Sequence, residues 1–327
     1  MVDRRVAAGL VILGLAVLLL LPPVAFALDE PFYVSLVRRI MIFAIAAVGL
    51  DIILGYGGLV SLGHAAFFGA GAYVVGVLSF HAAEDSLLLG WIPGTDAALI
   101  AWPAAVLTSA LLAFLIGLLS LRTSGVYFIM ITLAFAQMLY FFFVSLEGYG
   151  GDDGLQIWGR SRLPGDVLAD DTAFYYVVLG LLVTLLWLGR RMIDSRFGRV
   201  IRGIRQNERR MQAIGFATFR YKLVAFVIAG AMAGLAGALM ASQDEFVSPS
   251  LMHWTRSGEF IVMIVLGGMA TLFGPVIGAA VYLLLEEVLS SYTQHWQIIL
   301  GPVLVLVVLF GRGGIVGALR RLAVRDG

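Results

Sequence analysis

The feature that most constrains this chain is a series of apolar stretches that recurs along most of its length. They lie near residues 6–27, 40–55, 63–80, 98–120, 125–146, 173–189, 223–242, 257–270, 274–290 and 296–311. Several approach the ~20 residues that a helix needs to cross about 30 Å of hydrocarbon. The chain is 61% hydrophobic and 13% charged, whereas soluble domains carry roughly 25% charged residues. It is therefore an integral membrane protein.

The stretches are continuous and do not alternate with a period of two, so they predict helices and exclude a β-barrel. We expect an all-α integral membrane protein in which residues 1–327 form a single transmembrane domain of about ten helices. A count of nine to eleven also fits. The stretches at 40–55, 257–270 and 296–311 are short and flanked by glycine, which predicts tilted, broken or re-entrant helices.

The distribution of arginine predicts the orientation. Between Arg190 and Lys222 lie ten of the 22 basic residues, against two acids, which is typical of a cytoplasmic loop. Counting spans from this loop (190–222) places both termini in the cytoplasm and 147–172 outside. Arg38 and Arg39 fall on the external side and are the exception. The other loops assigned to the outside contain most of the acids, namely Glu84, Asp85, Asp96, Asp152, Asp153, Asp166, Asp170, Asp171, Asp244 and Glu245.

The first 27 residues allow two interpretations. A basic start, an apolar run and an A-x-A sequence ending at Ala27 are compatible with a cleaved signal peptide. The apolar run is slightly long for such a signal, so a first transmembrane helix is favoured. The rest of the topology is the same in both cases.

Motifs for catalysis or metal binding are not found. Lys222 is the only lysine, so a phosphate-binding G-x-x-x-x-G-K-[ST] loop is excluded, and there is no G-x-S-x-G motif or cysteine. Asp152–Asp153 and Asp170–Asp171 do not continue into a D-D-x-x-D run and are expected in solvated loops. The four histidines are His64, His81, His253 and His295. None has a second histidine four residues away with which it could bind a metal ion. We predict a non-catalytic protein without metal or cofactor, and the net charge of +1 does not indicate nucleic acid.

Polar residues inside apolar spans are candidates for a solute path. Asp51 lies within a span, where a lone carboxylate costs about 2.5–3.5 kcal/mol, so it is expected to face the protein interior. A structural role and a path role are equally compatible with this position, and Asp51→Asn is expected to impair transport or assembly. Thr132, Gln137 and Glu259 are weaker candidates. Glu286 and Glu287 are expected at the interface near the outer end of their span.

Two glycine-rich segments interrupt or border apolar spans: GYGGLVSLGHAAFFGAGAY (55–73) and GGMATLFGPVIGAAVY (267–282). Glycine lets helices unwind or approach closely, and freed backbone groups near a cavity can meet a polar solute. Tight packing alone explains the glycines equally well. Each segment has a Gly-Gly pair followed by Ser-Leu or Thr-Leu, a faint sign of an internal repeat. The path candidates here are Gly57, Gly58, Ser61, His64, Gly267, Gly268, Thr271 and Gly274.

Five segments in series carry a family resemblance. They are GYGGLVSLGHAAFFGAGAY (55–73), LRTSGVYFIMITLAFAQML (121–139), GGDDGL (150–155), FGRVIRGIRQNERRMQAIGFATFRYKLVAFVIAGAMAGLAGAL (197–239) and VLGGMATLFGPVIGA (265–279). Over roughly residues 40–310 the chain resembles the permease subunits of bacterial branched-chain amino acid ABC importers, of the LivM type. The resemblance implies the ABC-importer permease architecture in the bacterial inner membrane and transport of leucine, isoleucine or valine.

The resemblance also implies partners and a coupling segment. A homologous LivH-like permease would complete the path, two ATPase subunits would hydrolyse ATP, and a periplasmic binding protein would deliver substrate. The loop around 197–215 would dock on the ATPase. Glu208-Arg209-Arg210 departs from the E-A-A signature common in importers, which puts the detailed contacts in doubt. The resemblance implies the coupling residues Gly198, Arg202, Arg205, Glu208, Ala213 and Gly215. Arg199 is added to them because of its helical spacing.

The spacing of three and four residues between Arg199, Arg202, Arg205 and Arg209 predicts one shared helical face. The basic loop could instead set topology and bind anionic membrane lipid. Permeases for urea, short amides or other amino acids stay open as alternatives, as do an ion-coupled secondary transporter and a passive channel.

Overall fold

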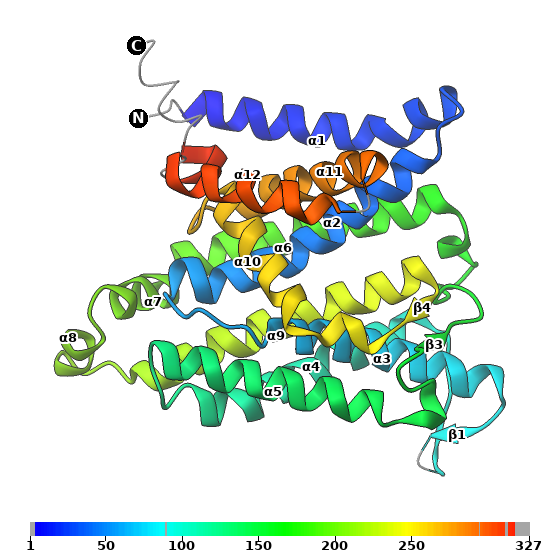
Figure 1. Cartoon of the computed structure of the whole chain (residues 1–327), viewed down its shortest axis with the longest axis horizontal. Helices are drawn as coiled ribbons and strands as arrows, with labels where there is room; N and C mark the ends of the chain where they lie inside the picture. Colours follow the sequence, from blue (N-terminus) through cyan, green and yellow to red (C-terminus); the bar gives the residue numbers. More distant parts are fainter. Residues whose placement is uncertain (1–3, 89, 294, 311–312, 318–327) are drawn as a thin grey trace.

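A computed structural model describes residues 4–88, 90–293, 295–310 and 313–317 (Figure 1). The α-helices are α1 (Arg4–Ala27), α2 (Phe32–Asp51), α3 (His64–Ala83), α4 (Ala98–Ser120), α5 (Val126–Val144), α6 (Asp171–Asp194), α7 (Arg196–Gln206), α8 (Glu208–Ala213), α9 (Thr218–Asp244), α10 (Trp254–Gly267), α11 (Gly274–Tyr292) and α12 (Trp296–Phe310). A π-helix, η1 (Ile52–Tyr56), continues α2. Short 3-10 turns are η2 (Glu147–Tyr149), η3 (Val167–Ala169) and η4 (Pro249–Met252).

Each of the ten apolar stretches forms a helix. Six helices are long and apolar enough to cross a membrane, namely α3, α4, α5, α6, α9 and α11. The expected shortness of α10 and α12 is confirmed, since they have 14 and 15 residues. The expected shortness of 40–55 was wrong, because α2 starts at Phe32 and runs to Asp51, where the π-helix η1 replaces the α-helix as far as Tyr56.

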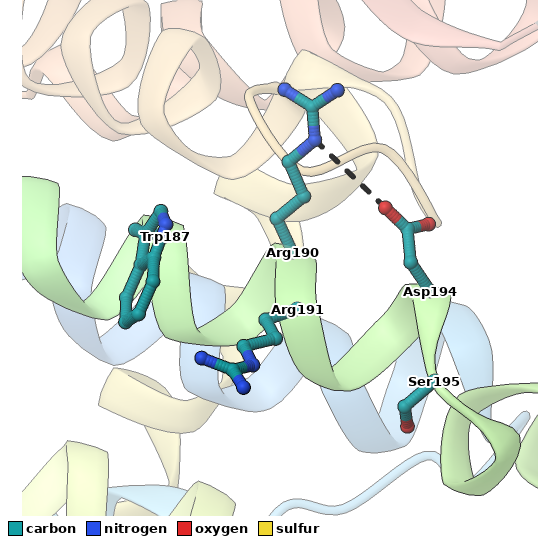
Figure 2. Close-up of a pocket in the computed structure, with 5 residues that line it drawn as sticks. All are labelled: Trp187, Arg190, Arg191, Asp194 and Ser195. Carbon is teal, nitrogen blue, oxygen red and sulfur yellow. Dashed lines mark ion pairs between the residues drawn. The ribbon is translucent and has the colours of Figure 1, made fainter.

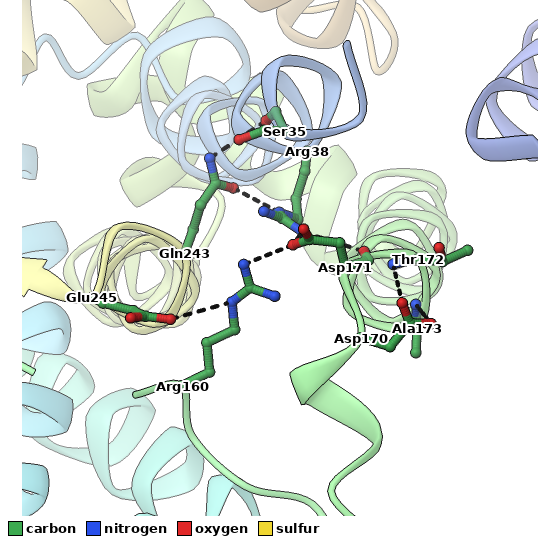
Figure 3. A network of polar contacts seen from close by, with 9 residues as sticks. All are labelled: Ser35, Arg38, Arg160, Asp170, Asp171, Thr172, Ala173, Gln243 and Glu245. Atoms are coloured by element: carbon green, nitrogen blue, oxygen red, sulfur yellow. Dashed lines mark hydrogen bonds and ion pairs between the residues drawn. The ribbon is translucent and has the colours of Figure 1, made fainter. Parts of the chain in front are cut away.

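The early start of α2 depends on how the structure accommodates Arg38. Its side chain is only 2% exposed and lies 2.9 Å from an oxygen of Asp171 on α6. Its Nε donates to Gln243 of α9 at 3.1 Å. Arg160 reaches the same Asp171 oxygen at 2.7 Å and Glu245 at 3.7 Å, so the network joins three helices and a loop (Figure 3).

This network explains the exception in the arginine distribution. The positive-inside rule counts charges in loops, whereas Arg38 is paired inside the bundle and Arg39 is paired with Glu286 at 3.4 Å. Asp170 and Asp171 are exposed, as expected of solvated residues, but both also have structural roles that the sequence did not indicate. Asp170 caps α6 by accepting from the amides of Thr172 and Ala173 at 3.3 and 3.2 Å, and Asp171 neutralises the buried arginine.

The centre of the bundle is α9, which packs against α2, α3 and α4. A methyl group on Gly71 of α3 would collide with the backbone of Gly234, and one on Gly237 of α9 would collide with the carbonyl of Phe68. Small residues at these points let the two backbones approach closely, as in other membrane helix pairs. Tight packing therefore explains Gly71 of the segment 55–73, and the glycines of α9 meet it in the same contact.

Two adjacent prolines shape the contact of α1 with the bundle. Pro22 and Pro23 have no N–H, so the carbonyls four residues earlier in the helix lose their usual partners. The hydroxyls of Tyr175 and Tyr176 on α6 donate to these carbonyls, Leu18 at 2.8 Å and Leu19 at 3.0 Å. Backbone groups freed in a membrane helix need such partners, so these bonds fix α1 against α6.

The two ends of the bundle differ (Figure 1). One end carries α7 and α8, and the start of α1 and the end of α12 lie on the same side. The opposite end carries two small antiparallel sheets. One pairs β1 (Leu87–Leu88) with β2 (Ile92–Pro93), and the other pairs β3 (Leu155–Gln156) with β4 (Phe246–Val247). The second sheet ties the 147–172 segment to the end of α9.

Candidate functional site

The segment between α6 and α9 is an amphipathic helix followed by a short second one. On α7, Val200, Ile201 and Ile204 are buried, whereas Arg199, Arg202 and Arg205 are exposed. The prediction that Arg209 extends this face was wrong. Asn207 adopts an extended conformation with φ −160° and caps α8 by accepting from the amide of Arg210 at 2.9 Å, so Arg209 belongs to a separate helix.

Glu208 holds α8 against the start of α9. Its Oε1 lies 2.7 Å from Nζ of Lys222 and accepts from the hydroxyl of Thr218 at 3.0 Å. Gln212 donates to the same hydroxyl at 3.0 Å. The single lysine is therefore a structural partner of Glu208, and α8 is fixed in direction by three side-chain contacts.

Gly215 ends α8. Its amide bonds to the carbonyl of Gln212 at 2.9 Å, and the amide of Phe216 bonds to Met211 at 3.1 Å, which is the Schellman arrangement. With φ +93°, this position suits glycine. The turn leaves Ile214 62% exposed and Phe216 36% exposed beside Ala213. We call the exposed face formed by Arg199, Arg209, Ala213, Ile214 and Phe216 the α7–α8 surface.

Two of the predicted coupling residues instead shape the corner between α6 and α7. Arg202 donates to the carbonyl of Ile193 at 3.0 Å and to that of Gly198 at 3.3 Å. A methyl group on Gly198 would collide with the Ile193 carbonyl. Arg202 therefore contacts one carbonyl in the last turn of α6, where the backbone carbonyls lack partners within the helix, and one carbonyl of α7.

Arg205 connects α7 to the helical core. Its guanidinium donates to the carbonyl of Gly55 in η1, and its Cγ lies so close to Gly58 that a methyl group there would come within 2.9 Å. Asp51, one turn before Gly55, is 2% exposed and accepts from the amide of Ala270 at 3.1 Å. We call these five residues the inner junction, since they link α7, η1 and the α10–α11 turn.

Gly267, Gly268 and Gly274 build the α10–α11 turn. A methyl group on Gly267 would collide with the carbonyl of Gly274, so the ends of α10 and α11 are in close contact. Gly268 has φ +121°, and the hydroxyl of Thr271 donates to its carbonyl at 2.6 Å. Gly57 lies against the carbonyl of Ile53 at the end of η1. The structure thus brings the candidates from 51–58 and 267–274 together.

A second group meets inside the bundle, where α3 begins after an extended segment (Figure 1). The hydroxyl of Ser61 accepts from the amide of Gly63 at 3.2 Å, and that of Thr132 on α5 accepts from the amide of Leu62 at 3.3 Å. Ser257 of α10 accepts from the amide of Ala65 at 2.8 Å. Hydroxyls from two other helices therefore satisfy amides at the buried start of α3.

His64 and Gln137 are placed differently from the other candidates. His64 is fully buried, its ring stands edge-on to Phe67, and neither ring nitrogen has a hydrogen-bond partner among the described residues. Gln137 lies on α5 apart from both groups. Sequence reasoning missed Ser257 and Ala270, because a serine in a helix and a backbone amide carry no signal until the partner segment is placed.

The residues Trp187, Arg190, Arg191, Asp194 and Ser195 line a shallow surface pocket near the end of α6 (Figure 2). Arg190 pairs with Asp194 at 3.9 Å, and Arg191 lies 5.6 Å from the ring centre of Trp187. Tryptophan and arginine at a helix end are typical of the membrane–water interface, so this pocket marks a boundary of the membrane. Among the described residues, no three His, Asp or Glu side chains converge as metal ligands.

Residues 32–309 match the family described as "Branched-chain amino acid transport system / permease component". The chain belongs to this family. It is 29% identical to the high-affinity branched-chain amino acid transport system permease protein LivM of Salmonella typhimurium and 28% identical to that of Escherichia coli, in each case over 95% of this chain and 77% of the relative.

Two other relatives match a smaller part of this chain. The LivH permease protein of Escherichia coli is 30% identical over 38% of this chain and 40% of its own length. The autoinducer 2 import system permease protein LsrC of Shigella flexneri is 27% identical over 72% of this chain and 64% of its own length. No solved structure matches the chain.

Proposed function

We propose that the chain is the transmembrane permease subunit of an ATP-driven importer of branched-chain amino acids in the bacterial inner membrane. Its partners would be a homologous LivH-like permease, two ATPase subunits and a periplasmic binding protein. Family membership and the similarity to the LivM and LivH permease proteins support this assignment. The ATPase is assigned to a separate subunit because the sequence has no phosphate-binding loop.

The observation that carries the proposal is the α7–α8 surface together with the inner junction. The surface combines exposed arginines with exposed Ile214 and Phe216, and apolar side chains surrounded by basic ones suit a protein partner. Through Arg205 the same segment contacts η1, and η1 is joined by Asp51 to the α10–α11 turn. Movement of a docked ATPase would thus be transmitted to η1 and to the α10–α11 turn.

The proposed orientation places α7, α8 and both termini in the cytoplasm. The ends of the chain that the structure describes lie on the side of α7 (Figure 1), and this is the side with the excess of arginine. Side chains on α4 and α5, such as Leu107 and Phe141, are 69% and 64% exposed. These apolar faces would contact membrane lipid or the homologous permease.

The test is reconstitution of the purified permease pair with the ATPase in liposomes, with the binding protein outside. ATP-dependent uptake of radiolabelled leucine, isoleucine or valine is expected. Uptake of none of the three, in a complex that hydrolyses ATP, would refute the substrate assignment. Uptake driven by an ion gradient without the ATPase would refute the transporter class. Exchange of Ile214 for Glu is expected to prevent co-purification of the ATPase. The control is Trp91→Glu, because Trp91 is 73% exposed between β1 and β2 at the opposite end.

A further inference from the structure

Four charged side chains gather where α2, α10 and α11 pack together, toward the end of the bundle opposite α7. Arg39 Nη2 lies 3.4 Å from Glu286 Oε1, and Arg256 Nη1 lies 2.8 Å from Glu259 Oε2. Both guanidiniums lie by the ring of Phe43, at 5.6 and 6.0 Å from its centre. The two ion pairs are therefore neighbours, and we call these four charged side chains the distal charge cluster.

The cluster lies within the membrane-spanning length of its helices. Arg39 is seven residues after the start of α2 at Phe32, and Glu286 is six residues before the end of α11 at Tyr292. With a rise of 1.5 Å per residue, both are roughly 9–11 Å inside the helix ends. Glu286 is thus deeper than the interfacial position expected from the sequence, and it is paired with an arginine.

The four side chains also reach the surface of the chain. Each keeps between 21% and 29% of its area exposed. Charged groups at this depth are strongly unfavourable against hydrocarbon and normally face water or protein. A guanidinium carries five N–H donors, yet the described residues supply Arg39 and Arg256 with one hydrogen-bond acceptor each. The cluster therefore presents unused donors on a surface that excludes lipid.

The Arg38 network is a useful contrast. Arg38 is 2% exposed and contacts Asp171 and Gln243, so this network is closed and structural. Arg39 is its sequence neighbour but points to a different set of helices and keeps 29% of its side chain exposed. Burial thus separates a structural arginine from one that remains available to a ligand.

We propose that the distal charge cluster lines the translocation path and binds the two charged ends of a zwitterionic amino acid. The inference rests on the proposed function and names the chemistry that the path recognises. Asp244 at the end of α9 also lies near both arginines. Because a zwitterion carries no net charge, it can exchange partners with both ion pairs without changing the net charge of the cluster. Its carboxylate would bind an arginine and its ammonium group a glutamate, through charge-assisted hydrogen bonds.

This arrangement suits a passing solute. The intrachain pairs compete with the substrate, so binding is weak enough for release, as a conducting path requires. The cluster lies near the end opposite the α7–α8 surface, where a substrate delivered from outside would enter. A neutral amide or urea has no use for paired opposite charges at this depth. The cluster therefore favours an amino acid as cargo.

The experiment uses the whole reconstituted complex and a double-mutant design. Arg256→Gln, Glu259→Gln and the double variant are compared for leucine uptake, complex yield and basal ATP hydrolysis. We expect each single variant to lower uptake about tenfold, the effect of one lost charge-assisted contact, with yield and basal hydrolysis unchanged. We expect the double variant to be at least as impaired as either single one. The matched control is Arg190→Gln with Asp194→Asn, an exposed helical pair on α6, for which uptake is expected to be unchanged.

Three results would overturn the inference. Recovery of uptake in the double variant would mean that the pair is only a structural ion pair, because no unpaired charge remains. Loss of the homologous permease from the complex would mean that the cluster is an interface between subunits. Wild-type uptake in every variant would mean that the path lies elsewhere. Absence of branched-chain amino acid uptake in the unmodified complex is a different result, which refutes the proposed function itself.

Discussion

The contact between Arg205 and Gly55 gives the sharpest test of how α7 communicates with the membrane domain. Arg205→Gln shortens the side chain and removes the charge, so the bond to the Gly55 carbonyl is lost. A hydrogen bond to a charged group contributes about 1.5–3 kcal/mol. Because Arg205 is exposed and solvent screens its charge, we take the lower end of this range. The substitution is then expected to weaken the contact between α7 and η1 by about 1.5 kcal/mol.

A loss of this size changes an equilibrium about tenfold. We therefore expect the ratio of leucine imported to ATP hydrolysed to fall about tenfold in Arg205→Gln liposomes. Co-purification of the ATPase is expected to be unchanged, since the α7–α8 surface is intact. Arg199→Gln is the matched comparison, because Arg199 is exposed on the same helix and has no side-chain partner among the described residues. It is expected to weaken ATPase binding instead.

The result that would refute this reasoning is an unchanged transport ratio in Arg205→Gln. Equal losses of ATPase binding in both variants would also refute it, because Arg205 would then be only a docking residue. Arg190→Gln, on the exposed end of α6, controls for the removal of one positive charge from this side of the protein. It is expected to leave both measurements unchanged.

Further variants test three individual sites. Asp51→Asn keeps an oxygen for the Ala270 amide and is expected to retain the yield of the complex, whereas Asp51→Ala leaves that amide unpaired and should destabilise the protein by about 1–3 kcal/mol in thermal unfolding. Asp171→Ala leaves Arg38 buried without its carboxylate and is expected to lower the unfolding temperature more than Arg38→Met, which removes the buried charge itself. Gly215→Ala places a side chain at φ +93°, at a strain of about 1–2 kcal/mol. We expect weaker ATPase binding and an unchanged unfolding temperature of the bundle. Unchanged ATPase binding would show that the end of α8 does not contribute to docking.

Much of the fold follows from local properties of the sequence. The ten apolar stretches predicted the positions of the long helices, because hydrophobic length is a property of a continuous segment. The start of α2 was missed by eight residues, since Arg38 and Arg39 interrupt the apolar run. Their charges are neutralised by Asp171 and Glu286, which lie far away in the sequence.

The candidate site shows the same division. The basic segment around 197–215 was recognised from its composition and family resemblance, but its break at Asn207 was not, because a helical spacing of arginines does not report a cap. Arg202 was selected as a docking residue, and the structure gives it the carbonyl of Ile193 as a partner. The packing of α6 against α7 decides which side chains of α7 bond to their own chain and which remain available to a partner.

The sequence by itself determined that the chain is a helical membrane protein, where its long helices lie, and which loop concentrates positive charge, because each follows from the residues of one segment. Only the tertiary structure decided which charges are neutralised inside the bundle and which remain available. Arg38 and Arg39 are adjacent and chemically identical, yet one is buried against Asp171 and Gln243 while the other joins Glu286 beside Arg256 and Glu259. Pairing energy depends on distance between groups that are remote in sequence, and only the packing of α2, α10 and α11 sets that distance.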